Sequence, residues 1–267
     1  MGVKKIKLFP NHDEKSLRVA KALAIELKKH NYQITDTAYD LAIAVGGDGA
    51  YLRMVRDNDF NNNVYYIGVN TGTLGFLQEV NPRELDLFLE RLQKESYTID
   101  EIGIQETQVI DKNKEITTFK SLNEMYIRNA NMCRADFRVD INNSFLERFA
   151  GDGLLVCTTI GSTAYNRNLG GAIIYRGFDT LQLTPIAGDN SSAFKSLTSP
   201  IVFPADTIIS ITPERRTKDL SIFYDTERNV IFKDIERVET TISKKRIKCL
   251  RMKDYDYAKI IQDKLLK

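Results

Sequence analysis

An unbroken apolar run, Leu41 to Val45, ends directly at the glycine-rich turn Gly46-Gly47-Asp48-Gly49. A short run without polar residues is typical of a strand buried on both faces, as in a parallel sheet covered by helices. An amphipathic stretch follows, in which Leu52 and Val55 are apolar and Arg53 is basic. Strand, glycine turn and helix in this order predict an α/β unit with backbone N–H groups gathered at a helix N-terminus.

The rest of the first hundred residues repeats this pattern. Residues 14–29 keep helical spacing of their apolar side chains, residues 64–69 form a second apolar run, and residues 85–92 return to helical spacing behind Asn81-Pro82. Alternating strand and helix signals in short units predict an open sheet with helices, in a Rossmann-like α/β domain. The last stretch, Tyr255 to Leu266, also has helical spacing, and we expect it to return to this domain.

Beyond about residue 97 the pattern changes to one typical of strands. Thr, Ile, Val, Phe and Tyr dominate, and apolar residues alternate with polar ones around positions 137–141, 209–211, 220–222 and 247–249. The segment 111–114 reads as a hairpin turn, and Lys244-Lys245-Arg246 as another turn. We therefore predict an α/β domain over 1–100, a β-sandwich domain over 101–250 and a returning helix over 251–267.

Composition excludes several classes of protein. The net charge of the 267 residues is only +2, which provides no general attraction to nucleic acid or to an anionic membrane. Cys133, Cys157 and Cys249 are far apart, and the two histidines lie near the N-terminus. These counts argue against a Cys-x-x-Cys zinc or redox motif and against a Ser-His-Asp triad. We expect a reduced, cytoplasmic protein.

The Gly46–Gly49 turn is the clearest chemical signal. Glycines let the backbone approach phosphate oxygens closely, and a carboxylate inside such a loop is costly unless it has a function. Asp48 could accept a proton from an attacking hydroxyl or hold Mg²⁺ on the phosphates, and Arg53 could reach the same anion. The alternative is a plain turn in which Asp48 caps the helix. The spacing matches neither G-x-x-x-x-G-K-[ST] nor G-x-G-x-x-G, which excludes a P-loop and an ordinary dinucleotide fingerprint.

Four further polar segments accompany this turn: Asn70 to Phe76, Asn123-Glu124, Gly151-Asp152-Gly153 and Gly161 to Asn166. The first follows a strand of the α/β layer, at the edge where open sheets bind ligands. Asn123-Glu124 follows Leu122 as a polar pair at the end of a strand, and by itself such a pair is more often an ordinary turn. The last combines small hydroxyls, amides and one Tyr, which suits a nucleoside, although an ordinary sandwich loop is an equal alternative.

Together these segments resemble the NAD kinase family, from Asp40 to about Asp225. The glycine turn alone is shared with lipid kinases and phosphofructokinases, whereas the order of all five segments is specific. The resemblance implies transfer of phosphate from ATP to the 2′-hydroxyl of the adenosine ribose of NAD, giving NADP and ADP. It also implies an α/β domain followed by a β-sandwich, a divalent metal such as Mg²⁺, and a homo-oligomer, often a tetramer.

The resemblance also implies roles for individual residues. Asp48 is the expected proton acceptor, Asn123 and Glu124 contact the adenosine half of NAD, Asp152 contacts the nicotinamide side, and Tyr165 lies near a base. Ala187 matches a pocket position near a subunit boundary. The full NAD-binding set implied in this way is Asp48, Gly49, Arg53, Phe76, Asn123, Glu124, Arg148, Asp152, Thr163, Ala164, Tyr165, Asn166, Arg167, Asn168, Ala187 and Asp225, with Gly46, Gly47, Asp48 and Gly49 as the phosphate loop.

Two positions depart from the family pattern. Ala50 follows Gly49 where Thr or another polar residue is usual, and Ala150 stands where a basic residue often precedes Gly-Asp-Gly. Arg148, two residues earlier and expected on the same strand face, could substitute for that basic residue. A lipid kinase and a non-catalytic NAD sensor are the rival functions; the first would need an apolar acyl groove, and the second would not need a carboxylate at Asp48.

Overall fold

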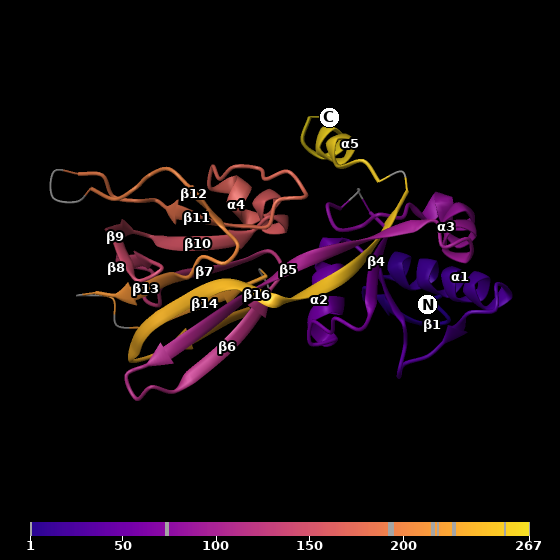
Figure 1. Cartoon of the computed structure of the whole chain (residues 1–267), viewed down its shortest axis with the longest axis horizontal. Coiled ribbons are helices and arrows are strands. Elements are labelled where there is room, and N and C mark those ends of the chain that lie inside the picture. Colours follow the sequence, from indigo (N-terminus) through magenta and orange to yellow (C-terminus); the bar gives the residue numbers. More distant parts are fainter. Residues whose placement is uncertain are drawn as a thin grey trace. The chain divides into compact units, whose positions relative to one another are not determined.

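The protein, seen in a computed structural model, divides into two compact units (Figure 1). Unit 1 comprises residues 1–102 and 245–267, and unit 2 comprises residues 103–244. The structure describes residues 2–72, 75–191, 195–214, 217, 219–225, 228–253 and 255–266.

Unit 1 is built on a parallel sheet. Its strands are β1 (Lys5–Pro10), β2 (Gln33–Ile34), β3 (Leu41–Gly46), β4 (Tyr65–Asn70) and the last part of β16 (Ile235–Met252). They lie in the order β2-β1-β3-β4-β16, and neighbouring strands run parallel. Every residue of β3 is buried, as the apolar run predicts for a central strand.

Helices complete unit 1. They are α1 (Glu14–Lys29), α2 (Asp48–Asp57), the 3₁₀ turn η1 (Pro82–Glu84), α3 (Leu85–Gln93) and α5 (Tyr257–Ile261), which continues as η3 (Gln262–Leu266). Asp13 caps α1 by accepting a hydrogen bond of 2.9 Å from the Ser16 N–H. Leu23 and Leu27 of α1 pack with Phe88 and Leu89 of α3 in one buried apolar cluster together with residues of the sheet.

A buried ion pair holds the end of β16 within unit 1. The Arg251 guanidinium contacts the carboxylates of Glu79 at 3.0 Å and Asp100 at 3.2 Å, and Glu79 also accepts the Met252 N–H. Because Arg251 and Glu79 are both almost fully shielded from water, removing one partner would leave the other charge buried without compensation. This contact fixes the strand from which the C-terminal helix departs.

Unit 2 consists of two antiparallel sheets. One contains, in order, β12 (Ile201–Pro204), β11 (Thr180–Ile186), β10 (Gly153–Thr158), β7 (Glu124–Asn129), β14 (Leu220–Tyr224) and β15 (Arg228–Phe232). The other contains β5 (Tyr97–Asp111), β6 (Ile116–Ser121), β8 (Ala135–Ile141), β9 (Ser144–Gly151), β13 (Ile209–Pro213) and the first part of β16. Short helical turns η2 (Ile160–Thr163) and α4 (Tyr165–Asn168) follow β10.

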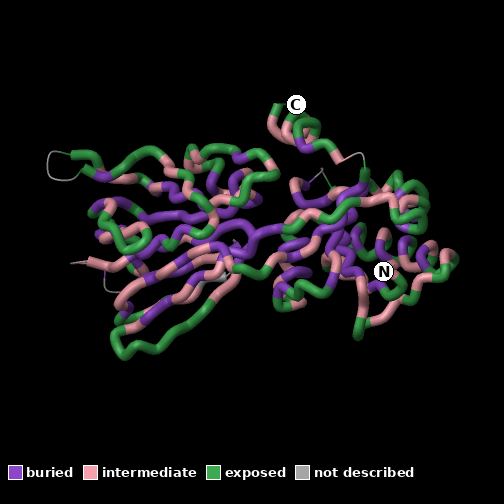
Figure 2. Tube along the Cα trace, viewed as in Figure 1, coloured by how far each residue is buried: buried purple, intermediate pink, exposed green. Residues whose placement is uncertain are grey.

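The core of unit 2 lies between these sheets. Phe137 and Phe149 from one sheet pack in one cluster with Met125, Val156 and Leu183 from the other. Alternate residues of each strand enter this core, as period-two sequence patterns require. In Figure 2 the buried stretches run along the strands, while the hairpin turns are exposed. The predicted fold class, an α/β domain followed by a β-sandwich with a returning C-terminal helix, is confirmed.

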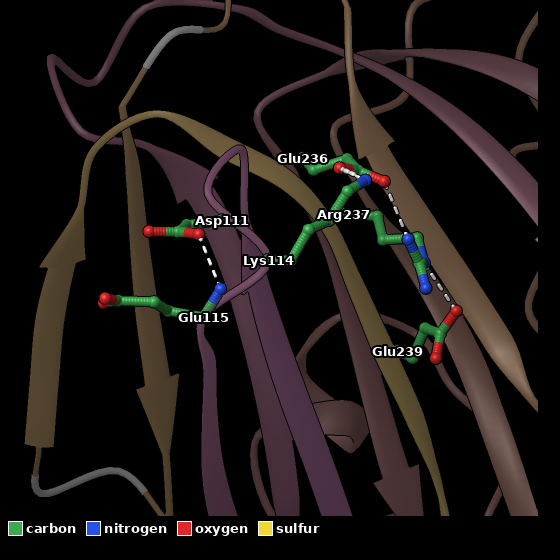
Figure 3. A network of polar contacts seen from close by, with 6 residues as sticks. All are labelled: Asp111, Lys114, Glu115, Glu236, Arg237 and Glu239. Atoms are coloured by element: carbon green, nitrogen blue, oxygen red, sulfur yellow. Dashed lines mark hydrogen bonds and ion pairs between the residues drawn. The ribbon is translucent and has the colours of Figure 1, made fainter.

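The β5–β6 hairpin turns where the sequence predicts it. Asp111 accepts the backbone N–H of Glu115 at 2.9 Å, which closes the turn. Beside it, Figure 3 shows Lys114 paired with Glu236, and Arg237 bonded to Glu236 and Glu239 at 2.8 and 2.7 Å. These partly exposed pairs contribute little stability each, so we assign them no function.

One predicted turn is wrong. Lys244, Lys245 and Arg246 lie inside β16, which continues without a break from Ile235 to Met252. Three consecutive basic residues resemble a solvated turn in the sequence. The strand tolerates them because Lys244 and Lys245 project into solvent, while alternate positions further along, such as Ile247 and Cys249, are fully buried.

We predict that Leu23→Ala destabilises the protein by about 2–5 kcal/mol, because it removes a side chain with 0% exposure and leaves a cavity. Ile25→Ala on the same helix is the control, since Ile25 is 57% exposed and should change the free energy of unfolding by less than about 0.5 kcal/mol. Urea denaturation followed by circular dichroism measures both. Equal losses for the two variants would contradict this packing.

Candidate functional site

The first group of candidate residues lies where β3 ends and α2 begins. Gly46 has φ = 157°, and a Cβ at this position would lie 2.8 Å from the Cβ of Ala50. Only glycine fits such a position without displacing the helix. Gly47 is the N-cap and Asp48 the first residue of α2, so a carboxylate stands at the positive end of the helix dipole.

The Asp48 carboxylate is held by the backbone of a second predicted segment. Its Oδ2 accepts the Phe76 N–H at 2.8 Å, and its Oδ1 accepts the Leu77 N–H at 3.0 Å. A Cβ on Gly75 would lie only 1.9 Å from Oδ1, so this close approach requires glycine. The structure therefore brings together the glycine turn and the segment after β4. Thr73 and Leu74 of that segment lie outside the described residues.

Gln78 completes this arrangement, and sequence reasoning missed it. Its Nε2 donates to the Gly47 carbonyl at 2.6 Å, and a Cβ on Gly68 would clash with its Oε1 at 1.9 Å. Gln78 is buried, so its amide is a structural link between the glycine turn and β4. One signal for it in the sequence was a glycine inside the apolar run of β4, which indicates that another group approaches the strand closely.

Arg53 and Phe76 lie beside this group. The Arg53 guanidinium donates to Asn11 Oδ1 and to the Pro10 carbonyl, each at 3.2 Å, at the end of β1. Phe76 is partly buried, and its ring centroid lies 5.8 Å from the Lys264 Nζ. Arg53 is thus anchored at the end of β1, next to the glycine turn. The Phe76 ring is partly exposed to solvent and partly covered.

The second group lies in unit 2, around the start of β7. The prediction that Asn123-Glu124 ends a strand is wrong, because β6 ends at Ser121 and Glu124 is the first residue of β7. Asn123 lies in the turn between these strands, which agrees with the alternative interpretation as a turn. Asp225, directly after β14, has φ = 47° and is 2% exposed. Its carboxylate accepts the N–H groups of Leu122 and Asn123 at 2.8–3.0 Å, so it fixes the turn that presents the pair.

Glu124 is the most unusual titratable group of unit 2. Its side chain has 0% exposure, and neither carboxylate oxygen has a hydrogen-bond partner among the described residues. Burial, and to a smaller extent the nearby Asp225 carboxylate, together raise the pKa of Glu124 to about 8, against a smaller opposing effect of the Tyr165 backbone. Glu124 is therefore protonated at neutral pH, and its hydroxyl is available as a donor. Glu124 and burial also raise the pKa of the neighbouring Cys157 thiol.

The loop after β10 covers this face of the sheet. Tyr165 begins α4, and its ring lies 5.2 Å from that of Tyr126, centroid to centroid. The Asn166 side chain is fully buried: it donates to the carbonyls of Ser162 and Ala172 and accepts the Thr184 hydroxyl at 2.6 Å. The Asn166 side chain therefore holds the loop in place through hydrogen bonds to both the loop and β11.

The rest of this loop is less enclosed. Thr163 donates to the Ile160 carbonyl and, like Ala164, is half-buried. Arg167 and Asn168 are exposed on the last turn of α4. These four residues are near Tyr165 in the chain, and none of them is enclosed as Asn166 is.

Asp152 and Ala187 occur on two adjacent turns. The Asp152 N–H donates to the Ile186 carbonyl at 2.9 Å, and both Asp152 and Ala187 are exposed. A Cβ on Gly151 would lie 2.7 Å from the Ala187 carbonyl oxygen, and one on Gly153 would lie 2.3 Å from the Ile127 carbonyl oxygen. The glycines of Gly-Asp-Gly are thus required by close packing, which leaves the Asp152 carboxylate to project into solvent.

Arg148 lies apart from these contacts. Its side chain is 65% exposed and its Nε lies 3.3 Å from a carboxylate oxygen of Glu214. Ala150 on the same strand is fully buried, and its backbone N–H donates to the Ser196 hydroxyl. The described contacts of Arg148 include no other residue of the candidate group.

Neither group contains a preformed metal cage. Within the described part of the chain, no three His, Cys, Asp or Glu side chains are grouped so as to hold a metal ion. Nor does any helix in that part have the length and apolar character to cross a membrane.

Comparison with known proteins assigns the chain to a family. A model of the ATP-NAD kinase N-terminal domain matches residues 5–97, and one of the C-terminal domain matches residues 122–252. The chain belongs to the ATP-NAD kinase family. NAD kinase of Finegoldia magna is 34% identical, over 98% of this chain and 97% of that protein. NAD kinase of Leuconostoc mesenteroides subsp. mesenteroides is 33% identical over 97% of both chains.

Solved structures of this kinase family share the fold. Yeast NADH kinase complexed with NADH matches with a TM-score of 0.85 and 17% identity, over 100% of this chain and 88% of the other. An NAD kinase from Archaeoglobus fulgidus in complex with ATP matches with a TM-score of 0.71 and 19% identity, over 96% of both chains. An α/β domain followed by antiparallel sheets is therefore the architecture of this kinase and of both structures.

We predict that Glu124 lowers the stability of the kinase as pH rises. Between its ordinary pKa near 4.5 and the value of about 8 in the fold, the folded state keeps a proton that the unfolded chain releases. The Glu124 contribution is thus fully present below pH 4.5 and is lost by about pH 8, at a slope of at most about 1.4 kcal/mol per pH unit. Melting curves of the wild type and Glu124→Gln from pH 5 to 8.5 should diverge, with the wild type losing more.

Glu236→Gln is the control for this titration. Lys114 lowers the pKa of Glu236, so this carboxylate stays ionised throughout the same pH range. Parallel melting temperatures of the wild type and Glu124→Gln across the range would show that Glu124 is ionised in the fold.

Proposed function

We propose that this chain transfers the γ-phosphate of ATP to the 2′-hydroxyl of the adenosine ribose of NAD, giving NADP and ADP. The observation that carries the proposal is the Asp48 carboxylate, held at the N-terminus of α2 by two backbone N–H groups in a chain that both ATP-NAD kinase domain models match. The NADH bound by the yeast enzyme and the ATP bound by the A. fulgidus enzyme support these two substrates.

Asp48 acts as the general base. The ribose O2′ attacks the γ-phosphorus, the bond from that phosphorus to the β–γ bridging oxygen breaks, and the O2′ proton moves to Asp48. Each Asp48 oxygen uses one lone pair for a backbone N–H and keeps another that can accept this proton. The two N–H bonds fix the carboxylate in one orientation, which lowers the entropic cost of proton transfer.

The glycine turn would bind the transferring phosphates. Gly47 and Gly49 are exposed at the start of α2, a helix of 10 residues, where the first N–H groups and the helix dipole favour an anion. Arg53 is anchored one turn further along and adds a positive charge near the end of β1. Phosphoryl transfer depends mostly on positioning and on neutralising charge, and this arrangement provides both.

The second unit would bind NAD. Protonated Glu124 can donate a hydrogen bond to a substrate hydroxyl without adding a negative charge near the pyrophosphate. Tyr165 would offer a ring face to a base, and the exposed Asp152 carboxylate would contact the nicotinamide side. We assign Asn166 and Asp225 an indirect role, because their side chains hold the loop and the turn that present these groups.

A divalent metal fits this chemistry. Mg²⁺ is usually held by one or two carboxylates together with substrate phosphates, so a single carboxylate at the phosphate loop is a sufficient donor from the protein. Asp48, with its remaining lone pairs, is the residue that would hold it. When bound, the ion would neutralise charge on the phosphates.

Two further expectations from the sequence stay predictions. They are a homo-oligomer, expected to be a tetramer, and a cytoplasmic location.

One coupled assay tests the reaction. The protein is incubated with NAD, ATP and Mg²⁺, and NADP is measured with an NADP-specific dehydrogenase. NADP formation excludes a lipid kinase and a non-catalytic NAD sensor, whereas no NADP at any concentration of enzyme would refute the proposal. Repeating the assay with NADH or with polyphosphate identifies the preferred acceptor and donor.

We predict that Asp48→Asn lowers kcat for NADP formation by about 10²- to 10⁴-fold, the usual contribution of a positioned base. The amide keeps one oxygen to accept a backbone N–H, but it faces the other N–H with a donor. We therefore expect a modest loss of stability, about 1–3 kcal/mol. Steady-state kinetics, the NAD dissociation constant and a melting curve give the three quantities.

Asp57→Asn is the matched control, because Asp57 is exposed at the other end of α2. It should leave kcat unchanged. A folded Asp48→Asn protein with kcat within about tenfold of the wild type would show that another group accepts the proton.

We also predict that Asp152→Ala weakens NAD binding by about tenfold or more without unfolding the protein. Asp152 is exposed, and Gly151 and Gly153 carry the packing of this turn, so the carboxylate itself adds little stability. Titration calorimetry measures the affinity. Asp206→Ala, in the exposed turn after β12, is the control. Unchanged affinity in folded Asp152→Ala would remove Asp152 from the site.

A further inference from the structure

One face of β7 carries three side chains at alternate positions. Glu124, Tyr126 and Arg128 share this face because successive residues of a strand point to opposite sides. Tyr126 and Tyr165 pack on a small buried cluster formed by residues of β10 and β11. Arg128 is not among the residues that the sequence singles out, although the alternation from Glu124 places it on the same face.

Arg128 contacts both tyrosines. Its guanidinium donates from Nη2 to the Tyr165 hydroxyl at 3.1 Å, and its Cζ lies 5.8 Å from the centroid of the Tyr126 ring. Tyr126 in turn stacks on Phe223, with centroids 4.3 Å apart and planes 5° from parallel. The Arg128 guanidinium thus holds the Tyr165 ring by its hydroxyl, and the stacked Tyr126 and Phe223 rings lie beside this guanidinium.

The path of the Arg128 side chain depends on a sequence motif already noted. Gly153 of Gly-Asp-Gly pairs with Arg128 across β10 and β7, and a Cβ on Gly153 would lie 2.9 Å from the Arg128 Cγ. A larger residue at position 153 would have to displace the aliphatic part of the Arg128 side chain. The second glycine of the motif therefore leaves room for Arg128 as well as for the β7 backbone.

No carboxylate within the described part of the chain pairs with Arg128, and its Nε is buried there without a hydrogen-bond partner. A partly buried guanidinium without an ion pair costs desolvation energy that one neutral hydroxyl only partly offsets. Fixing a side chain before a ligand arrives lowers the entropic cost of binding, which gives a reason for keeping such a contact.

We propose that Arg128 is a positioning residue that sets the Tyr165 ring for stacking on a base of NAD. This inference rests on the proposed function. Arg128 acts through the Tyr165 hydroxyl and does not touch the reacting atoms. Without Arg128 the Tyr165 ring is free to move in the free enzyme, and ordering it costs entropy when NAD binds. The bound ground state and the transition state bear this cost equally, so substrate binding is weakened and the chemical step is unchanged.

The test is a double-mutant cycle with Arg128→Met and Tyr165→Phe. Each single variant should raise KM for NAD about tenfold, which corresponds to about 1.4 kcal/mol, with kcat within about twofold of the wild type. The double variant should be no worse than either single one, because both remove the same contact. Arg128→Lys keeps the charge but not the planar guanidinium, and its KM for NAD should lie between those of the wild type and Arg128→Met. Arg237→Met, on β16, is the control for loss of an arginine elsewhere in unit 2.

A second readout does not depend on activity. In protein labelled with [¹³Cε]tyrosine, the Tyr165 signal is identified by its absence in Tyr165→Phe among the 12 tyrosines. This signal should shift and change width in Arg128→Met but not in Arg237→Met, with unchanged melting temperatures. If the wild type makes no NADP, the proposed function fails, and this spectrum still tests the contact.

Three results would overturn the positioning role. They are an unchanged Tyr165 signal in folded Arg128→Met, an equal fall of kcat and kcat/KM in that variant, and additive effects on KM in the double variant. Additive effects would mean that Arg128 contacts the substrate independently of Tyr165.

Discussion

The contact between the Asp48 carboxylate and the backbone N–H groups of Phe76 and Leu77 fixes the residue that we propose as the general base. It joins the end of β3 to the segment that follows β4, two pieces of chain that the parallel sheet brings to the same edge. Glycine at 75 is the condition for this contact, because any Cβ would overlap the carboxylate. A carboxylate fixed in this way would need no reorganisation to act as the proposed base when the substrate arrives.

The second unit uses two carboxylates in opposite ways. Asp225 accepts backbone N–H groups and serves as a structural clamp for the turn at Asn123. The Glu124 oxygens have no hydrogen-bond partner of normal geometry among the described residues, and burial keeps Glu124 protonated. The difference is one of hydrogen bonding and not of residue type, since a carboxylate with N–H partners can stay ionised where one without them cannot. A neutral Glu124 suits the binding of a ligand that carries its own negative charges.

Much of the fold could be predicted from the sequence. The helix predicted at 14–29, the apolar strands at 41–45 and 64–69 and the hairpin turn at 111–114 follow from periodicity and turn residues, and the structure has these elements within one or two residues of those bounds. These are local signals, decided within a few residues. The run Lys244–Arg246 was misread because its strand is held by pairing partners distant in the chain, which no local pattern records. The hydrogen bonds of Arg128 to Tyr165 and of Gln78 to Gly47 also join residues distant in the chain, so local patterns do not predict them.

The sequence by itself determined the order of the motifs, and with it the family and the positions of Asp48, Glu124 and Asp152. Glycine stands at 46, 75, 151 and 153 in the sequence, but the close contacts that require it there are visible only in the fold. Tertiary structure alone decided which polar side chains are available to a ligand. Asn166 and Asp225 are taken up by the backbone and by Thr184, whereas Asp152 is exposed and Glu124 is buried with no hydrogen-bond partner in the part of the chain that the structure describes. The reason is physical: a side chain's hydrogen-bond partners and its burial are set by segments far away in the chain, so they arise only when the strands pair.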